Sequence, residues 1–145
     1  MATGDIKDPY LGGNFLVEID GISRGAFQQV SGFDSTVTIT EYREGNDIAR
    51  LRKLPGMVSY SNLQLRWGMA DDRDLYDWHL AAVKGDVQRK NGSIVLMDRR
   101  GTTEVARWNF VRAWPTKWEG PTFSGKGNDI AIDTLVLASE GVTRA

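Results

Sequence analysis

The sequence lacks cysteine, and it contains one histidine, His79, and 4 prolines in 145 residues. The absence of cysteine excludes disulfide scaffolds, thiolate metal sites and cysteine nucleophiles. A single histidine leaves too few nitrogen ligands for a dedicated zinc site. No run of about 18 apolar residues occurs, so we expect no transmembrane helix. The sequence therefore lacks residues that most catalytic and metal-binding sites require.

The charged residues nearly balance, with 18 Lys and Arg against 19 Asp and Glu and a formal net charge of −1 at pH 7. No global field draws such a chain to nucleic acid or to an anionic membrane, so we expect neither specific nucleic-acid binding nor membrane insertion. Asp5 and Asp8 stand where a signal peptide needs basic residues, which predicts assembly in the cytoplasm without a signal peptide. A partner must be recognised by a local surface.

The chain length suits one domain over residues 1–145. Five Trp, four Tyr and five Phe suit a well-filled β core or a large interface. Alternating apolar residues predict a mainly β fold, a β-barrel or sandwich, with one flanking α-helix. We expect strands over residues 14–20, 26–30, 35–42, 58–67, 87–90, 93–98, 103–114 and 129–138.

Two of the expected strands form a hairpin, and another contains an irregularity. Glycines between residues 14–20 and 26–30 predict that the second strand returns beside the first. In residues 58–67 the apolar alternation slips by one near Ser61-Asn62. A β-bulge there would keep both halves facing the core.

Turn signals divide the second half of the chain. The dipeptide Asn91-Gly92 predicts a tight turn between two short strands. Pro115 is expected to end the strand over residues 103–114. That strand is predicted to place three aromatic side chains on one face: Trp108, Phe110 and Trp114.

Residues 71–84 predict the single helix. Asp71 or Asp72 can cap its start, and Lys84-Gly85 supplies a stop. Apolar or aromatic side chains recur at the helical spacing i, i+3, i+4 and i+7, at Leu75, Trp78, His79 and Ala82.

Three patterns that suggest chemistry have plainer interpretations. Residues 120–127 nearly match a phosphate-binding loop, but Gly127 stands where the magnesium-binding hydroxyl belongs, and a strand pattern follows instead of a helix. We interpret this segment as a flexible loop. The acids of residues 71–77 favour helix-dipole and solvent contacts over metal binding or acid–base chemistry. His79, without a second histidine or a serine elbow, is interpreted as a core or interface side chain. We expect no enzyme activity, cofactor or metal.

The segment 43–57 breaks the strand pattern and predicts a long charged loop between two strands. Basic and acidic residues lie close together in it, as in contacts that set the register between protein copies. Aromatic residues for base stacking are not interleaved with its basic residues, so a protein contact is favoured over a nucleic-acid groove.

Several short stretches together resemble the inner tube proteins of contractile injection systems and the tail tube proteins of contractile phages. The resemblance covers residues 8–144 in order and with matching spacing. It rests on Asp8-Pro9-Tyr10, Asn14 to Gly21, Gly25 to Phe27 with Val30 to Phe33, Tyr42 to Gly45, Arg52 to Gly56, Ala113 to Pro115 with Lys117, and Glu140-Gly141.

This resemblance implies a structural subunit that assembles into stacked hexameric rings, the hollow inner tube that a contracting sheath drives through a target envelope. It implies partners among further copies of the chain, the sheath, the baseplate and cap proteins, with cargo in the lumen. It also implies a phage tail-like particle that can be released from the cell. In the family, strands of six subunits join into one barrel around the lumen.

The family's loop between the second and third long strands reaches a neighbouring subunit or ring, and it corresponds here to residues 43–57. The resemblance therefore assigns inter-subunit contacts to Arg43, Glu44, Arg50, Arg52, Lys53, Leu54 and Pro55. Polar side chains on the neighbouring strands, all but one of them neutral, suggest a lumen face that does not hold cargo. That face is expected at Thr36, Thr38, Thr40, Ser59, Ser61, Gln64 and Arg66; the alternative is that these side chains face outer solvent.

One function of a different class stays open at this stage. A monomeric β-barrel could bind a small ligand or a carbohydrate through exposed tryptophans. The two functions differ in oligomeric state, because a tube subunit must self-assemble.

Overall fold

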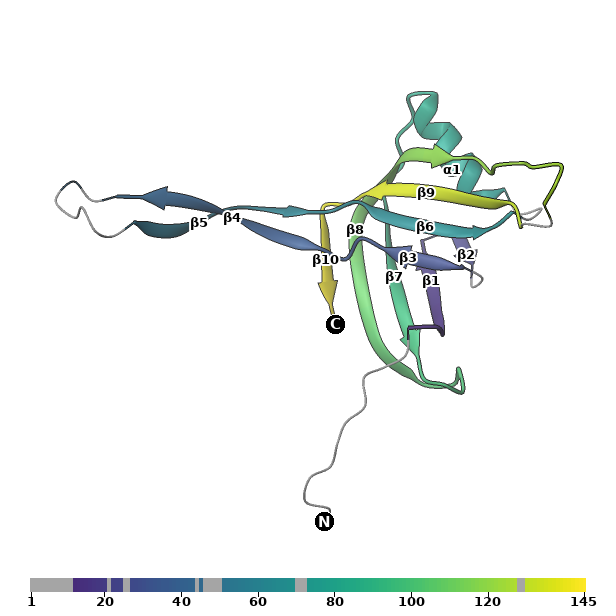
Figure 1. Ribbon diagram of the computed structural model, residues 1–145, viewed down its shortest axis with the longest axis horizontal. Coiled ribbons are helices and arrows are strands. Elements are labelled where there is room, and N and C mark those ends of the chain that lie inside the picture. Colours follow the sequence, from purple (N-terminus) through teal and green to yellow (C-terminus); the bar gives the residue numbers. More distant parts are fainter. Residues whose placement is uncertain are drawn as a thin grey trace, which may run out of the picture.

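The computed structural model describes residues 12–20, 22–24, 27–43, 45, 51–69, 73–127 and 130–145. Strands dominate it, and one helix lies against them (Figure 1). The elements are β1 (Phe15–Ile19), β2 (Ile22–Arg24), β3 (Gln29–Ser31), β4 (Ser35–Tyr42), β5 (Arg52–Tyr60), β6 (Leu63–Gly68), α1 (Asp74–Val83), β7 (Lys90–Met97), β8 (Glu104–Glu119), β9 (Ile132–Ala138) and β10 (Gly141–Arg144).

Eight strands form one continuous, strongly bent sheet in the order β2-β1-β7-β8-β9-β6-β3, with β10 paired to β8. The 16-residue β8 joins its two halves, because its first part pairs with β7 and β10 and its second part with β9. Figure 1 shows β6 and β9 running across β1 and β7. The bend turns the sheet into two layers with the core between them.

A bulge in β8 produces part of this bend. Lys90 pairs with Ala113 while Gly92 pairs with Phe110, so β8 holds an extra residue between them. Arg112 there has φ 50°, and its backbone N–H donates to Asn91 Oδ1 at 2.9 Å. The side chain of Asn91 thus satisfies the backbone donor that the bulge takes out of the ladder.

The core lies between the two layers and is rich in aromatic and branched side chains. The ring of Trp67 is 5.3 Å from that of Trp118 and 5.6 Å from that of Phe27, both in edge-to-face geometry. The largest side chains that are almost completely buried are Trp67, Phe110, Leu63, Leu65, Leu75, Leu135 and Leu137.

The helix α1 packs its apolar stripe against β8. Leu75 and Trp78 are buried, and Trp78 Nε1 donates to the carbonyl oxygen of Gln88 at 2.7 Å. His79 lies 6.1 Å from the ring of Trp118, and its buried Nδ1 has no hydrogen-bond partner within the described residues. Desolvation by burial lowers the pKa of His79, which favours the neutral imidazole in the folded chain.

The helix confirms the predicted element but begins at Asp74, later than expected. Asp71 and Asp72 lie outside the described residues. Leu75 and Trp78 of the predicted stripe are buried, whereas His79 and Ala82 are half-buried.

Several strand predictions are wrong in their limits. The partner of β1 is β2, because Ile22 pairs with Ile19, and β3 pairs with β6 instead. Residues 58–67 are not one strand facing the core: β5 ends at Tyr60, and Val58 is 54% exposed. The last six residues of the predicted loop over residues 43–57 are strand, because β5 begins at Arg52. The strand β10 has no counterpart among the predictions.

The turn predicted at Asn91-Gly92 is also wrong, because both residues lie within β7. Pro115 does not end β8, which accommodates it at a second irregularity between Pro115 and Lys117. The bulge at Arg112 shifts the alternation, so that Ala113 is buried and Trp114 falls on the opposite face from it. The three aromatic side chains predicted on one face are therefore not all there.

Gly92 leaves room for the ring of Phe110. A Cβ atom at Gly92 would lie 2.3 Å from Phe110 Cζ and 2.5 Å from the carbonyl oxygen of Glu18. We expect Gly92→Ala to lower the free energy of unfolding by about 1–3 kcal/mol, the typical effect of overpacking. Gly120→Ala is the control, since nothing lies within 4 Å of its Cβ position. Equal urea midpoints for the two variants would contradict this packing.

The lowered pKa of His79 predicts a pH-dependent stability. The unfolded chain gains a proton as the pH falls through the ordinary histidine pKa of about 6.5, whereas the folded chain resists protonation, so the folded state loses stability there. We expect urea midpoints to fall between about pH 7.5 and about pH 5.5. His79→Gln should reduce this fall, and an unchanged pH dependence in that variant would exclude His79 as its source.

Candidate assembly surfaces

The hairpin of β4 and β5 projects from the body as a separate two-stranded sheet (Figure 1). All eight residues of β4 are exposed, and in β5 only Tyr60 is partly buried. Because isolated two-stranded hairpins are marginally stable in water, contacts outside the chain are the natural source of further stability.

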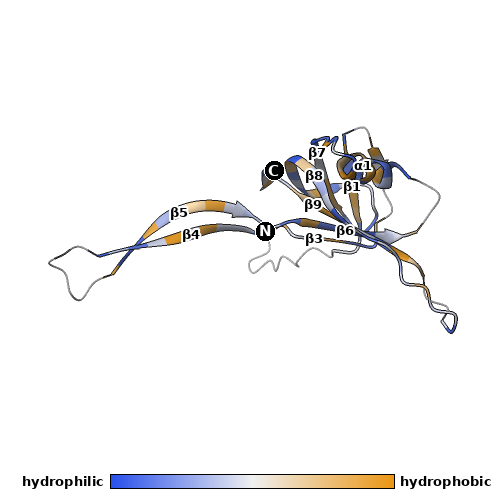
Figure 2. Cartoon of the chain, turned by 90° about the horizontal axis from the view of Figure 1, so that it is seen from above, coloured by the Kyte–Doolittle hydropathy of each residue, from blue (hydrophilic) through white to orange (hydrophobic). Residues whose placement is uncertain are grey.

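One face of this hairpin is apolar. Val37 pairs with Val58 across the hairpin, and Ile39 pairs with Pro55. Val37 is 52% exposed and Ile39 63%. Figure 2 shows hydrophobic stretches on both strands, away from the body. Solvent-exposed apolar side chains gathered in this way mark an interaction surface.

The other face carries hydroxyl groups. Thr36 pairs with Ser59, and Thr38 Oγ1 donates to the carbonyl oxygen of Met57 at 3.1 Å. Gly56 lies under the threonines, since a Cβ atom there would be 2.5 Å from Thr38 Oγ1 and 3.1 Å from Thr40 Oγ1. The structure thus brings four predicted lumen residues together on the hairpin: Thr36, Thr38, Thr40 and Ser59.

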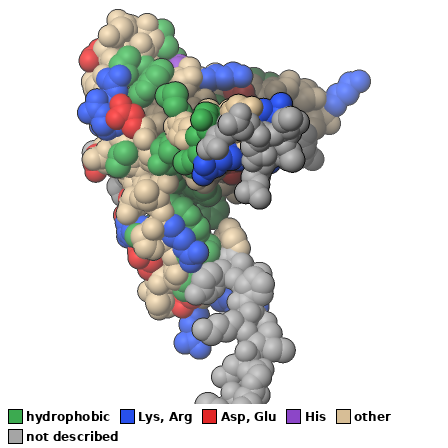
Figure 3. All heavy atoms as spheres, turned by 90° about the vertical axis from the view of Figure 1, so that its left-hand side faces the viewer, with side chains coloured by type: hydrophobic (Ala, Val, Ile, Leu, Met, Phe, Trp, Pro, Cys, Tyr) green, Lys and Arg blue, Asp and Glu red, His purple; other side chains and the backbone are tan. Residues whose placement is uncertain are grey.

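Most of the predicted inter-subunit residues lie toward the far end of the hairpin. Lys53 pairs with Glu41, and Arg52 pairs with Tyr42. Leu54 and Pro55 continue β5, while Arg43 follows β4. Figure 3 faces this end of the molecule and shows Lys and Arg side chains beside hydrophobic ones. Glu44 and Arg50 lie outside the described residues.

The remaining predicted lumen residues do not lie on the hairpin. Gln64 and Arg66 belong to β6, where they alternate with the buried Leu63, Leu65 and Trp67. The Arg66 guanidinium donates to Gln29 Oε1 at 3.2 Å. Ser61 lies between β5 and β6, and its hydroxyl donates to the carbonyl oxygens of Gly32 and Asp34.

Alternation along the ladder does not by itself unite these two groups. Ser31 pairs with Gln64 and Ser35 with Tyr60, with three residues between the pairs on each strand. Counted through this constant register, Ser59 is in phase with the buried Leu63, and Val58 is in phase with Gln64. A twist between the hairpin and the sheet is therefore needed to bring both groups to one space.

A second apolar surface lies at the other end of β6. Met69, just after β6, is 57% exposed, and Phe123 and Ile130 are 78% and 77% exposed. The Met69 amide donates to the carbonyl oxygen of Ala131 at 2.8 Å. Sequence reasoning missed this surface, because Phe123 stands alone among polar and glycine residues and Ile130 fits the alternation of the strand predicted over residues 129–138.

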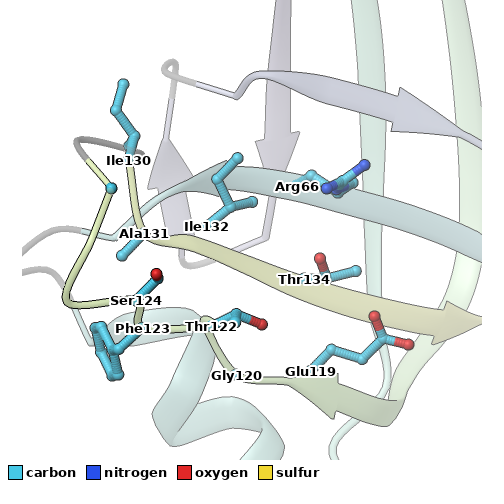
Figure 4. Close-up of a pocket in the computed structure, with 11 residues that line it drawn as sticks. Arg66, Glu119, Gly120, Thr122, Phe123, Ser124, Ile130, Ala131, Ile132 and Thr134 are labelled. Carbon is cyan, nitrogen blue, oxygen red and sulfur yellow. The ribbon is translucent and has the colours of Figure 1, made fainter.

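Phe123 and Ile130 border a pocket of about 420 Å³ (Figure 4). Its wall includes Arg66, Glu119 and Thr134 from the sheet. The segment 120–127 forms an irregular loop there, and β9 follows it. This confirms the interpretation as a loop rather than a phosphate-binding motif, which requires a helix at that position.

Within the described part of the chain, the larger sheet has open edges, and two of them are β3 and the last part of β8. β3 pairs with β6 on one side, and the last part of β8, residues 114–119, pairs with β9 on one side. Unpaired edges offer rows of backbone donors and acceptors to another strand.

A family comparison decides the class of protein. Residues 12–143 match the model of the T4-like virus tail tube protein gp19 family. The chain belongs to this tail tube family. The match confirms the predicted family and the predicted structural role as a tube subunit.

Solved structures share the tail tube fold. A chain in the sheath/tube terminator of the PVC extracellular contractile injection system in its extended state is 30% identical, with a TM-score of 0.88, covering 97% of this chain and 99% of that one. A chain in the PVC sheath-tube complex is 30% identical, with a TM-score of 0.86 and coverages of 97% and 93%. These matches confirm the predicted mainly β, tail tube-like fold.

The fold extends to more distant structures. A chain in the baseplate of the anti-feeding prophage, solved with six-fold symmetry, is 24% identical, with a TM-score of 0.85 and 97% coverage of both chains. Curated protein sequences contain no match. In the described part of this tail tube chain, the helix is too short and polar to cross a membrane. The described residues also contain no group of three or more His, Asp or Glu arranged to hold a metal ion.

Proposed function

We propose that this chain is the repeating subunit of the inner tube of a contractile injection system, assembled as stacked hexameric rings, with no catalytic role. The family match and the 30% identity to a chain in the PVC sheath-tube complex support this proposal. The observation that carries it is the projecting hairpin, whose apolar face is exposed in the single chain.

Self-assembly follows from where the apolar surfaces lie. The hairpin precedes β6, and the surface of Met69, Phe123 and Ile130 lies beyond its end. The chain thus has two different exposed apolar surfaces, one at each end of β6. Such an arrangement favours heterologous, head-to-tail contacts, which close into rings or extend as open stacks. Such contacts suit a tube.

The open sheet edges supply contacts around a ring. The edge of β3 in one copy can pair with residues 114–119 of β8 in the next, which would join the sheets into one barrel. A net charge of −1 allows many copies to pack without strong mutual repulsion.

We propose that the polar face of β6, with Gln64 and Arg66, and the hydroxyl face of the hairpin line the lumen. Hydroxyl and amide side chains there would let cargo pass without a strong attraction. Sheath, baseplate and cap proteins are the further partners, within a phage tail-like particle. The relatives come from sheath-tube, terminator and baseplate assemblies, which supports these partners.

A monomeric carbohydrate-binding barrel has less support. Such a protein would present tryptophan faces to solvent, but all five tryptophans here are buried or half-buried. Most of the exposed large hydrophobic side chains lie instead on the hairpin and at the opposite end of β6.

Adjacent residues on opposite faces of β5 test the docking of the hairpin. We expect Val58→Asp to abolish rings and tubes in negative-stain images, because the charge would have to be buried against another copy. Ser59→Asp should still assemble, since its face is open to water in the tube. Both variants should keep the wild-type melting temperature, since both sites are exposed. Tubes formed normally by Val58→Asp, or a wild-type chain that stays monomeric at every concentration, would contradict the proposal.

Single cysteines test the lumen, and the lack of native cysteine makes the labelling specific. In end-capped tubes, Gln64→Cys and Thr36→Cys should react with a small thiol reagent and resist a bulky one. Asp77→Cys, on the exposed side of α1, is the control that both reagents should label. Free labelling of Gln64→Cys by the bulky reagent would place β6 outside the lumen, and the same result for Thr36→Cys would exclude only the hairpin face.

A further inference from the structure

The hairpin joins the sheet through a short neck, residues 32–34 on one strand and residues 61–62 on the other. The ladder keeps its register through this neck, since Ser31 pairs with Gln64 below it and Ser35 with Tyr60 above it. The regular strands nevertheless stop on both sides. Flexible linkers have no reason to preserve a register, so the neck is an ordered junction.

Ser61 holds the two strands of the neck together. Its amide donates to the carbonyl oxygen of Asp34 at 3.1 Å. Its part-buried hydroxyl lies 3.2 Å from the carbonyl oxygen of Gly32 and 3.3 Å from that of Asp34. One residue thus bridges to both ends of the opposite strand segment.

Gly32 permits a close approach of the two strands. Its φ of +100° favours glycine, and a Cβ atom there would lie 2.1 Å from the carbonyl oxygen of Asn62. A side chain at this position would push the strands apart and change the direction in which the hairpin leaves the sheet.

Two aromatic side chains anchor the neck to the opposite layer. The ring of Phe33 stacks on Trp108 of β8, with centroids 5.4 Å apart and planes inclined by 20°. Tyr60 lies against Gly141 at the start of β10, where a Cβ atom would be 3.8 Å from its ring. Phe33 of the neck and Tyr60, the residue of β5 next to it, therefore both contact the layer formed by β8 and β10.

We propose that the neck is a positioning element, built on Ser61, Gly32 and Phe33, that fixes the direction of the hairpin before it meets a second copy of the chain. Fixing the direction in advance reduces the ordering cost of docking. The docking step rests on the proposed tube function, whereas the fixed direction is a property of the single subunit.

Spin-label distances in monomeric subunits test the fixed direction without assembly. Labels at Thr40→Cys on the hairpin and Asp74→Cys on α1 should give a narrow distance distribution in the otherwise wild-type chain. Ser61→Ala and Phe33→Ala should broaden this distance distribution. Ser61→Thr, which keeps the hydroxyl, should give a distribution as narrow as that of the labelled wild-type chain. A second pair at Thr143→Cys and Asp74→Cys, both in the body, should stay narrow in every variant.

Assembly supplies the second readout. Loss of the Ser61 hydroxyl should raise the subunit concentration needed for tubes by about 3- to 10-fold, the factor that one lost hydrogen bond typically gives. The matched control is Ser93→Ala, which removes a 2.6 Å hydrogen bond to Asn109, a residue on the face of β8 opposite to that of Trp108. It should leave both the distance distribution and the assembly concentration unchanged.

The outcomes separate the two proposals. Distributions as narrow in Ser61→Ala and Phe33→Ala as in the parent would overturn the positioning role, whatever the chain assembles into. A broader distance distribution for the hairpin pair alone, in a chain that never forms tubes, would support the positioning role of the neck and refute the proposed tube function. Broadening of the body pair as well would show a general loss of structure and would also overturn the specific role.

Discussion

The structure depends on one constraint: a two-stranded ribbon can bury neither of its faces within its own chain. Val37, Ile39 and Val58 are more than half exposed on the hairpin, although valine and isoleucine at such spacing normally face a core. The body needs none of them, because its core is filled by side chains from its own two layers. The hairpin therefore adds nothing to the core of the single subunit, and its apolar side chains can be buried only against another molecule.

The body meets a different demand, which is to hold two layers and a projecting arm in one geometry. β8 does this by running through both layers, with a bulge at Arg112 that Asn91 satisfies. The aromatic side chains extend that framework, since Trp118 contacts Trp67 within the core and Tyr76 from the helix. Rigid layers of this kind allow contacts made at one end of a subunit to be held in register with contacts at the other.

The sequence predicted what depends on local patterns. The helix, β1, β4 and most of β9 follow from spacing that short-range physics determines, and the family follows from the order of many short motifs. The errors arose where long-range packing overrides a local signal. Asn91-Gly92 is a strong turn signal, but here Gly92 is needed under Phe110 and Asn91 at a bulge. Pro115 has its place at an irregularity that only the pairing with β9 reveals.

In the candidate surfaces, too, local patterns predicted some positions and long-range contacts decided the others. Thr36, Thr38, Thr40 and Ser59 do share a face, because alternation along β4 places the three threonines together and Ser59 pairs with Thr36. Ser61 could not be assigned from alternation, since it lies between strands and bonds to the backbone across the neck. In the proposed tube, the projecting hairpin of each subunit overlaps the neighbouring subunit. The two strands of the hairpin cross the boundary between neighbouring subunits. A force along the tube axis would therefore act on the peptide backbone as well as on side-chain contacts.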